Sequence, residues 1–292
     1  MSYIASPVRM RADSDELKYH SNRWESREIC HILTKLGYDV DAIDFDDTHF
    51  VPKREYDIVF DIYTNLHRLE SRFSAQTIKL LHATGSDPYY QNAAELARIN
   101  ALNARRGSQC TPKRLIASPE QSRRAFEAAD FCSLIGNSHT VSTYPEHIRS
   151  KMTCVPVSAS QTGSRHKKRH EFVPEKREFL WYFGSGAVHK GLDLLLEVFA
   201  QNPGWTLNIV GYVNSEADFV ETFWHELHNL PNIRNYDALR PDSDAFHAIL
   251  KDVFCVVAPT CSEEYHLQWR QPCKSGYTLS SAEILVFHFQ MG

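Results

Sequence analysis

Short apolar runs alternate with longer amphipathic stretches along most of this chain. In the first half, apolar residues recur at helical spacing over 24–36, and Gly37 stops that helix. Two further helices are predicted, one over 88–107 and one that ends at 126–130. The short runs that predict buried strands are 3–7, 38–43, 56–62, 77–83 and 131–135. This alternation favours parallel sheet with crossover helices.

The pattern breaks at a polar, turn-rich stretch over 157–176 and then restarts. The strands predicted after the break are 178–183, 206–210, 233–236 and 253–259, and the helices between them are 191–199, 217–230 and 243–251. We therefore expect an α/β fold with two Rossmann-like domains. The first covers residues 1–165, a linker covers 166–176, and an incomplete second domain covers 177–263.

Composition is that of a globular protein and does not indicate a nucleic-acid partner. The 292 residues are 42% hydrophobic, and 36 acidic against 32 basic residues leave a formal net charge of −4. The richest basic run, RHKKRH at 165–170, lies in the polar stretch and is typical of a solvated linker.

Cysteine usage and hydropathy predict a cytoplasmic protein. The seven cysteines are scattered without C-x-x-C spacing, so we expect reduced thiols and no zinc or redox site. The N-terminus lacks an apolar leader, and no run approaches the roughly 20 apolar residues of a transmembrane helix. These features predict a protein without a transmembrane segment, and they allow peripheral membrane contact.

The segment FLWYFGSGAVHKGLDLLLEVFA, residues 179–200, is the strongest candidate for chemistry. An apolar strand runs into GSG, and Lys190 follows just before an amphipathic helix. Glycines let a backbone approach a ligand closely, and exposed amides near a helix start favour phosphate. A nicotinamide dehydrogenase is disfavoured, because His189 stands where G-x-G-x-x-G needs its third glycine. A tight strand–helix turn with an exposed lysine is the alternative interpretation.

This segment resembles the nucleotide-sugar site of group 1 (family 4-like) glycosyltransferases, which are retaining enzymes of the GT-B fold. NIVGYV at 208–213 is similar to the family's second strand and loop, and PNIRNYDALR at 231–240 to its segment beside the nucleobase. FCVVAPTCSE is similar to the strand that leads to the first glutamate of E-x7-E, here Glu263. The donor-binding residues that this resemblance implies are Gly184, Ser185, Gly186, Ala187, Lys190, Gly211, Tyr236 and Glu263.

The first half resembles the acceptor-side domain of the same family. SNRWESREICHILTKLGYDVDAID is similar to its opening loop and helix, although serine and asparagine replace the usual two glycines. KLLHATG and LIGNSHTVSTY are similar to its cleft-lining strand ends, and the first of them contains His82. The residues that the resemblance places on the acceptor side are Ser21, Asn22, Glu25, Asn137 and Ser138. On residue type alone, a lone histidine at a strand end is more often a satisfied core or rim residue, and an Asn-Ser pair is often a helix cap.

The resemblance also implies a mechanism. Negative charge builds on the departing nucleoside diphosphate, so Lys190 and the neighbouring amides would stabilise the transition state more than the ground state. Glu263 would hold ribose or sugar hydroxyls, and His82 would point at the sugar from the other domain. The expected partners are a nucleotide-sugar donor and a saccharide or other hydroxyl acceptor, with no metal and no further cofactor.

Two other functions stay open at the level of sequence. One is an inactive remnant that binds nucleotide sugar weakly or not at all. The other is a nucleotide-sugar epimerase of the same fold, because the strand ends LNIVG and APTCSE fit that class as well. Transfer of sugar to an added acceptor separates a transferase from both.

The resemblance stops after Glu263. Residues 264–292 have no strand–helix period, although a helix is expected there. If one lost nucleotide is restored after the codon of Glu263, the same bases can read GVSPPVATAMQVGLYPIISRNTGISFPDG. That reading is similar to the expected family segment, with threonine where the second glutamate of E-x7-E would be. We therefore expect the tail to be out of frame and the second domain to be truncated.

Overall fold

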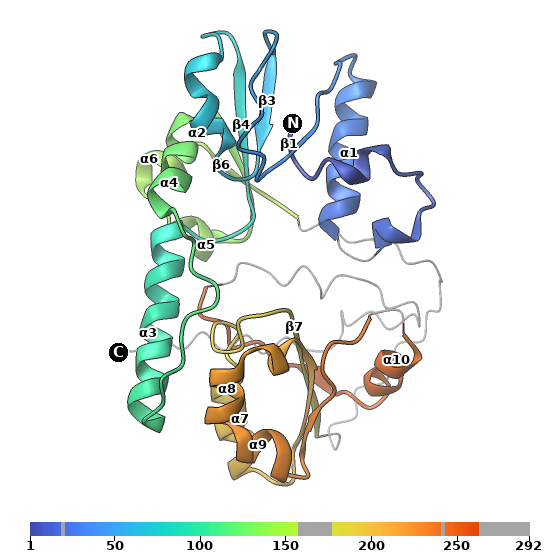
Figure 1. The fold of residues 1–292 in the computed structure, drawn as a ribbon, viewed down its shortest axis with the longest axis vertical. Coiled ribbons are helices and arrows are strands. Elements are labelled where there is room, and N and C mark those ends of the chain that lie inside the picture. Colours follow the sequence, from blue (N-terminus) through green and yellow to red (C-terminus); the bar gives the residue numbers. More distant parts are fainter. Residues whose placement is uncertain (19–20, 157–176, 241–242, 263–292) are drawn as a thin grey trace. The chain divides into compact units, whose positions relative to one another are not determined.

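A computed structural model describes residues 1–18, 21–156, 177–240 and 243–262 (Figure 1). The chain divides into two compact units, each with its own parallel sheet. Within the described ranges, the first unit contains 1–90 and 116–156, and the second contains 91–115 and 177–262. The predicted linker 166–176, Glu263 and the predicted tail 264–292 lie outside the described residues.

The first unit is built on a parallel sheet with the strand order β2-β1-β3-β4-β5-β6. Its strands are β1 Ser2–Tyr3, β2 Ile43–Asp44, β3 Ile58–Asp61, β4 Ile78–Ala83, β5 Phe131–Ile135 and β6 Met152–Val155. Its α-helices are α1 Ser21–Lys35, α2 Asn65–Leu69, α4 Pro119–Ala128, α5 Ser138–Ser142 and α6 Glu146–Arg149. Its 3-10 helices are η1 Ser6–Arg9, η2 Asp15–Lys18 and η3 Glu70–Arg72. Helix α1 covers one face of this sheet, and α2, α4 and α6 cover the other (Figure 1).

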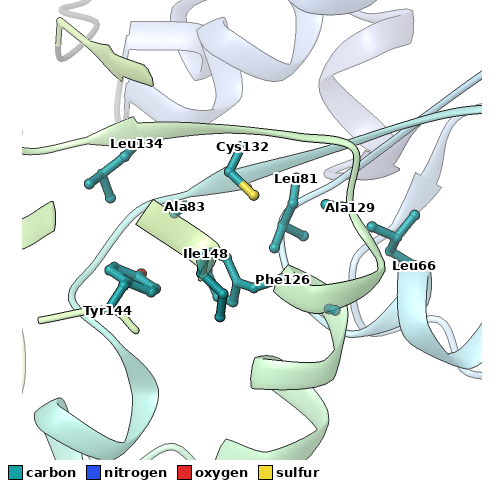
Figure 2. Close-up of a cluster of buried hydrophobic side chains, with 10 residues drawn as sticks. Leu66, Leu81, Ala83, Phe126, Ala129, Cys132, Leu134, Tyr144 and Ile148 are labelled. Carbon is teal, nitrogen blue, oxygen red and sulfur yellow. The ribbon is translucent and has the colours of Figure 1, made fainter. Parts of the chain in front are cut away.

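Successive side chains of β4 point alternately to an apolar and a polar face of the sheet. Leu81 and Ala83 are buried with residues of β5, α2, α4 and α6 in the apolar core drawn in Figure 2. Because successive strand side chains point to opposite faces, His82 lies on the other side of the sheet. There it approaches Glu25 of α1. The strand pattern therefore directs the histidine away from the apolar core.

The second unit has the strand order β10-β7-β8-β9, and all four strands are parallel. Its strands are β7 Glu178–Phe183, β8 Thr206–Gly211, β9 Ile233–Asn235 and β10 Cys255–Val256. Its helices are α7 Leu192–Gln201, η4 Val213–Ser215, α8 Ala217–Thr222, α9 Trp224–Asn229 and α10 Asp244–Leu250. Helices α7, α8 and α9 lie on one face of the sheet and α10 on the other (Figure 1). The predicted α/β class with parallel sheets is confirmed.

Helix α3, Pro88–Arg106, contributes most of its length to the second unit. Glu95, Ile99 and Leu102 recur at helical spacing on its buried face. Near its end, Arg105 pairs with Asp193 of α7 at 3.2 Å. The strand–helix alternation of the sequence does not indicate that residues 91–115 pack with the second sheet.

Four predicted elements differ clearly from the structure. The strand predicted over 253–259 is reduced to the two residues of β10. The strand predicted over 38–43 is reduced to β2 at its far end, after Gly37 ends α1 in the left-handed region with φ 96°. The strand predicted over 3–7 stops at Tyr3, because the 3-10 helix η1 begins at Ser6 and has Pro7 in its first turn. The helix predicted over 217–230 is interrupted at Phe223, whose φ and ψ of −114° and 25° are not helical.

Candidate functional site

The order of strands in the second unit creates a switch point beside β7. After β7 the chain adds β8 and β9 on one side, and β10 then returns to the other side of β7. Connections that leave the carboxyl ends of β7 and β10 therefore diverge, which is where open α/β sheets bind their ligands. The glycine-rich loop 184–191 follows β7 at this point, and residues 257–262 follow β10.

Loop 184–191 packs directly on the chain that follows β10. Gly191 has a φ of 76°, and a Cβ atom there would overlap the backbone carbonyl of Pro259. The amide of Cys261 donates to the carbonyl oxygen of His189 at 3.0 Å. Gly191 is therefore required both for its left-handed backbone and for the close approach of the two segments.

The amides of this loop bind a carboxylate of the protein itself. The backbone N–H of Gly186 donates to Oε1 of Glu216 at 2.5 Å. The N–H of Ala187 donates to both carboxylate oxygens of Glu216 at 3.1 Å. Gly186 has a φ of 92°, so two successive amides point the same way, as in an anion-binding nest. The amides of Gly186 and Ala187, which the sequence assigned to the diphosphate, are therefore occupied by Glu216 in the structure.

Glu216 is held as a buried carboxylate. It precedes α8 at the N-cap position, yet its side chain makes no capping bond and reaches loop 184–191 instead. Burial raises the pKa of the Glu216 carboxyl above its usual value, and the amides of Gly186 and Ala187 oppose that shift. The contact therefore fastens the loop after β7 to the loop after β8.

Lys190 lies at the end of the same loop and is only 7% exposed. Its ammonium nitrogen is 5.6 Å from the ring centroid of Phe183, the last residue of β7. Its backbone is fixed at both ends, because its N–H donates to the carbonyl of Gly186 and its carbonyl accepts from the indole of Trp181. The lysine is therefore placed at the carboxyl end of β7 rather than on an open surface.

A buried acid–histidine contact joins the loop to α3. Nδ1 of His189 lies 3.4 Å from Oε2 of Glu95, and both side chains are shielded from solvent. Oε1 of Glu95 accepts from the amides of Lys113 and Arg114 at 2.8 Å each. Burial alone would raise the pKa of Glu95, but His189 and the amides of Arg114 and Lys113 outweigh it and hold that pKa below its usual value.

The other predicted donor-binding residues of the described chain lie at the same edge of the sheet. Gly211 ends β8 beside Phe183, where a Cβ atom would overlap the carbonyl oxygen of Phe183. Tyr236 follows β9, donates its N–H to Ile209 and is 38% exposed. Ser185 and Gly184 form the more accessible tip of the loop. Glu263, the remaining donor-binding residue, lies outside the described residues.

In the first unit, His82 belongs to a buried polar cluster. Its Nδ1 is hydrogen-bonded to Oγ of Ser133 on the neighbouring strand at 2.8 Å, and its ring stacks on Phe60. Its Nε2 lies 3.9 Å from Glu25, whose carboxylate accepts from the Tyr3 hydroxyl at 2.6 Å. Burial lowers the pKa of His82, and Glu25 offsets only part of that shift. Tyr3 and Ser133 are members of this cluster that the sequence did not indicate.

The predicted acceptor-side residues divide into two groups within the first unit. Glu25 joins His82, whereas Ser21 and Asn22 begin α1, with Ser21 buried. Asn137 caps α5, where its side chain accepts from the amides of His139 and Thr140, and the exposed Ser138 is the first residue of that helix. The structure therefore gives Asn137 the capping role that its residue type allowed.

Glu216 and Glu95 are the main site residues that the sequence did not reveal. Each is a single glutamate in a polar stretch, and each acts through backbone amides about 20 to 30 positions away in the chain. Composition and periodicity carry no information on such contacts. The one available signal was the glycine-rich loop itself, whose buried amides need hydrogen-bond acceptors.

The described residues contain neither a metal-binding cluster nor a membrane-spanning helix. No group of three or more His, Cys, Asp or Glu side chains in the described ranges is arranged to hold a metal ion. In the same part of the chain, no helix is both long and apolar enough to cross a membrane.

Comparisons with known proteins found a distant structural likeness. Neither a protein-family model nor a curated protein sequence matches this chain. A point mutant of S. aureus TarM in complex with fondaparinux, alpha-GlcNAc-glycerol and UDP is similar over 80% of this chain, with 12% identity and a TM-score of 0.44. A second crystal structure of TarM is similar over 86% of the chain, with 13% identity and a TM-score of 0.41. The chain spans 42% and 43% of the lengths of these two structures.

Proposed function

We propose that this chain is a glycosyltransferase that moves a sugar, with retention, from a nucleotide-sugar donor to a hydroxyl acceptor. The observation that carries the proposal is the position of loop 184–191 at the β7/β10 switch point, with Lys190 at its end. The sequence resemblance to family 4-like glycosyltransferases supplies the reaction type.

The chemistry assigned to Lys190 follows from the leaving group. As the bond from the anomeric carbon to the diphosphate breaks, negative charge accumulates on the diphosphate oxygens. A cation that is held in place and shielded from water stabilises that charge more strongly than one in bulk solvent. The burial of Lys190 and its fixed backbone meet this requirement. We therefore assign the diphosphate to the carboxyl end of β7.

We also assign roles to the other predicted site residues. Gly211 and Tyr236 follow the neighbouring strands and are assigned to the nucleoside. Glu263 is assigned to ribose or sugar hydroxyls, and the acceptor to the first unit, with His82 and Glu25 as its polar groups. The buried hydrogen bond of His82 to Ser133 supports an orienting role for this ring.

Calorimetric titration with UDP and GDP, and then with their sugar conjugates, tests the proposal. We expect one of the two series to bind the 292-residue chain, and Lys190→Ala to weaken binding roughly 10- to 100-fold through loss of a charge-assisted contact. Lys251→Ala, at the exposed end of α10, is the control and should leave affinity unchanged. Equal affinity of wild type and Lys190→Ala would refute the site assignment.

Product analysis distinguishes transfer from the other open functions. A bound donor sugar should appear on an added saccharide or other hydroxyl acceptor with the anomeric configuration of the donor. Isomerisation of the donor without an acceptor would instead identify an epimerase. Binding without any turnover would identify a remnant.

A further inference from the structure

Segment 91–115 is rich in positive charge, and most of that charge is neutralised. Its five cations are Arg98, Arg105, Arg106, Lys113 and Arg114. Arg98 and Arg105 face the buried carboxylate of Asp193. Arg106 pairs with Glu226 at 2.7 Å, and Lys113 with Asp218 at 2.9 Å. Four of the five cations therefore serve to attach the segment to the second sheet.

Arg114 differs from its four neighbours. Its side chain is exposed, and within the described residues its guanidinium makes no hydrogen bond or ion pair. Its backbone is nevertheless fixed, because its N–H donates to Glu95 at 2.8 Å and its carbonyl accepts from Gln91 at 2.8 Å. Arg114 therefore presents a guanidinium that is not neutralised by a described neighbour, on a backbone that is held in place.

The stem of Arg114 lies directly over Gly186. A Cβ atom on Gly186 would be 2.5 Å from Cγ and 3.1 Å from Cδ of Arg114. Any side chain at position 186 would therefore displace this arginine. The glycine has two functions here: it allows the φ of 92°, and it leaves room for the Arg114 methylenes against the loop.

The charge balance of the loop shows why a further cation is needed. Glu216 already occupies the amides of Gly186 and Ala187 and adds a negative charge beneath the loop. Lys113 is the cation that lowers the pKa of Glu216, and it is itself paired with Asp218. Arg114 adds a positive charge beside this loop, because its stem lies against Gly186. A guanidinium can bind two phosphate oxygens at once.

From these contacts we infer that Arg114 is a phosphate-binding residue of the donor site, which supplies the second positive charge for the diphosphate from outside the β7–α7 loop. The inference rests on the proposed function, since it takes loop 184–191 as the diphosphate site. It assigns a ligand-binding role to a residue that lies far in sequence from the glycine-rich segment.

Titration of the full chain with UDP and with GDP tests this inference. Arg114→Gln should weaken binding of the recognised diphosphate roughly 10- to 100-fold, and Arg114→Lys should recover part of the loss because it keeps a charge on a similar stem. Arg177→Gln is the matched control, because Arg177 is exposed and directly precedes β7 at the amino end of the sheet. Its affinity should equal that of wild type.

Salt separates a direct contact with phosphate from a structural role. Screening should reduce the difference between wild type and Arg114→Gln in about 1 M NaCl if the guanidinium acts by charge. A difference that is equal at low and high salt, or an unchanged affinity of Arg114→Gln, would overturn the inference while the proposed function stands. Failure of wild type to bind either diphosphate would overturn both.

Discussion

At the scale of single residues, loop 184–191 depends on groups that leave no room for substitution. Gly191 combines a positive φ with contact against Pro259, and Gly186 does the same against Arg114. The carboxylate of Glu216 then satisfies two amides that would otherwise be buried without a partner. The loop is therefore held by Pro259, Arg114 and Glu216, which come from three separate parts of the chain.

Gly191→Ala should destabilise the second unit. The left-handed backbone costs about 1 kcal/mol for a residue with a side chain, and the overlap with Pro259 forces a further shift, so we expect a loss of roughly 2 to 4 kcal/mol. Urea denaturation measures this loss. Gly204→Ala is the control, because a Cβ atom there meets no atom within 4 Å. Equal urea midpoints for the two variants would contradict the close contact of Gly191 with Pro259.

Glu216→Gln should loosen the loop without disturbing the sheet. Glutamine offers a single acceptor atom and places its amide group near the N–H donors, so we expect a loss of about 1 to 3 kcal/mol. Hydrogen exchange of residues 184–188 should become faster. The exposed Glu221→Gln on α8 is the control. Unchanged exchange in Glu216→Gln would show that the carboxylate does not hold the loop.

At the scale of elements, one of the ion pairs that attach α3 to the second sheet involves a fully buried acid. Asp193 of α7 is fully buried and faces Arg98 and Arg105 of α3. Burial raises the pKa of Asp193 to about 6, although both arginines oppose the shift. The folded protein therefore binds a proton on Asp193 more tightly than the unfolded chain does. The contribution of Asp193 to the free energy of unfolding must therefore fall as the pH rises from about 4 to 6.

Asp193→Asn should remove that pH dependence. Relative to this variant, wild type should lose about 2 to 3 kcal/mol of unfolding free energy between pH 4 and pH 7, because the shift is about two pKa units. Urea denaturation of both proteins across this range measures the difference. A constant difference between the two at every pH would mean that Asp193 does not titrate in this window.

Elements with strong local signals could be predicted, and those held by distant contacts could not. The continuous apolar run at 178–183 became β7, and the amphipathic pattern over 88–107 became α3. The short α2, α5 and α6 and the strand β6 were missed, because four or five residues carry too little periodicity. The packing of 91–115 on the second sheet depends on ion pairs such as Arg105–Asp193, which join residues 88 positions apart.

In the candidate site, too, residues with a local sequence signal could be predicted and residues held by distant contacts could not. Glycine and lysine in loop 184–191 could be recognised from sequence, because they carry chemistry in their own types and spacing. The occupation of the loop amides by Glu216 and the position of Arg114 could not, because neither residue belongs to a motif. The residue types of loop 184–191 therefore indicate its chemistry, whereas its surroundings depend on the tertiary fold.

At the scale of the whole molecule, we propose that residues 264–292 are read in the wrong frame. Resequencing of the locus should recover one additional nucleotide after the codon of Glu263. The frame-restored protein should then unfold at a higher temperature than the 292-residue chain, because it can continue the second domain. Several independent reads that keep the present frame to Gly292 would refute this proposal.

The most direct test of the central claim is hydrogen exchange, followed by mass spectrometry, with and without UDP or GDP. We expect added protection in peptides that contain loop 184–191 and the segment that follows β10, and unchanged exchange at the amino ends of β7 and β8. Protection that appears elsewhere, while loop 184–191 exchanges as in the free protein, would contradict the assignment of this loop to the diphosphate.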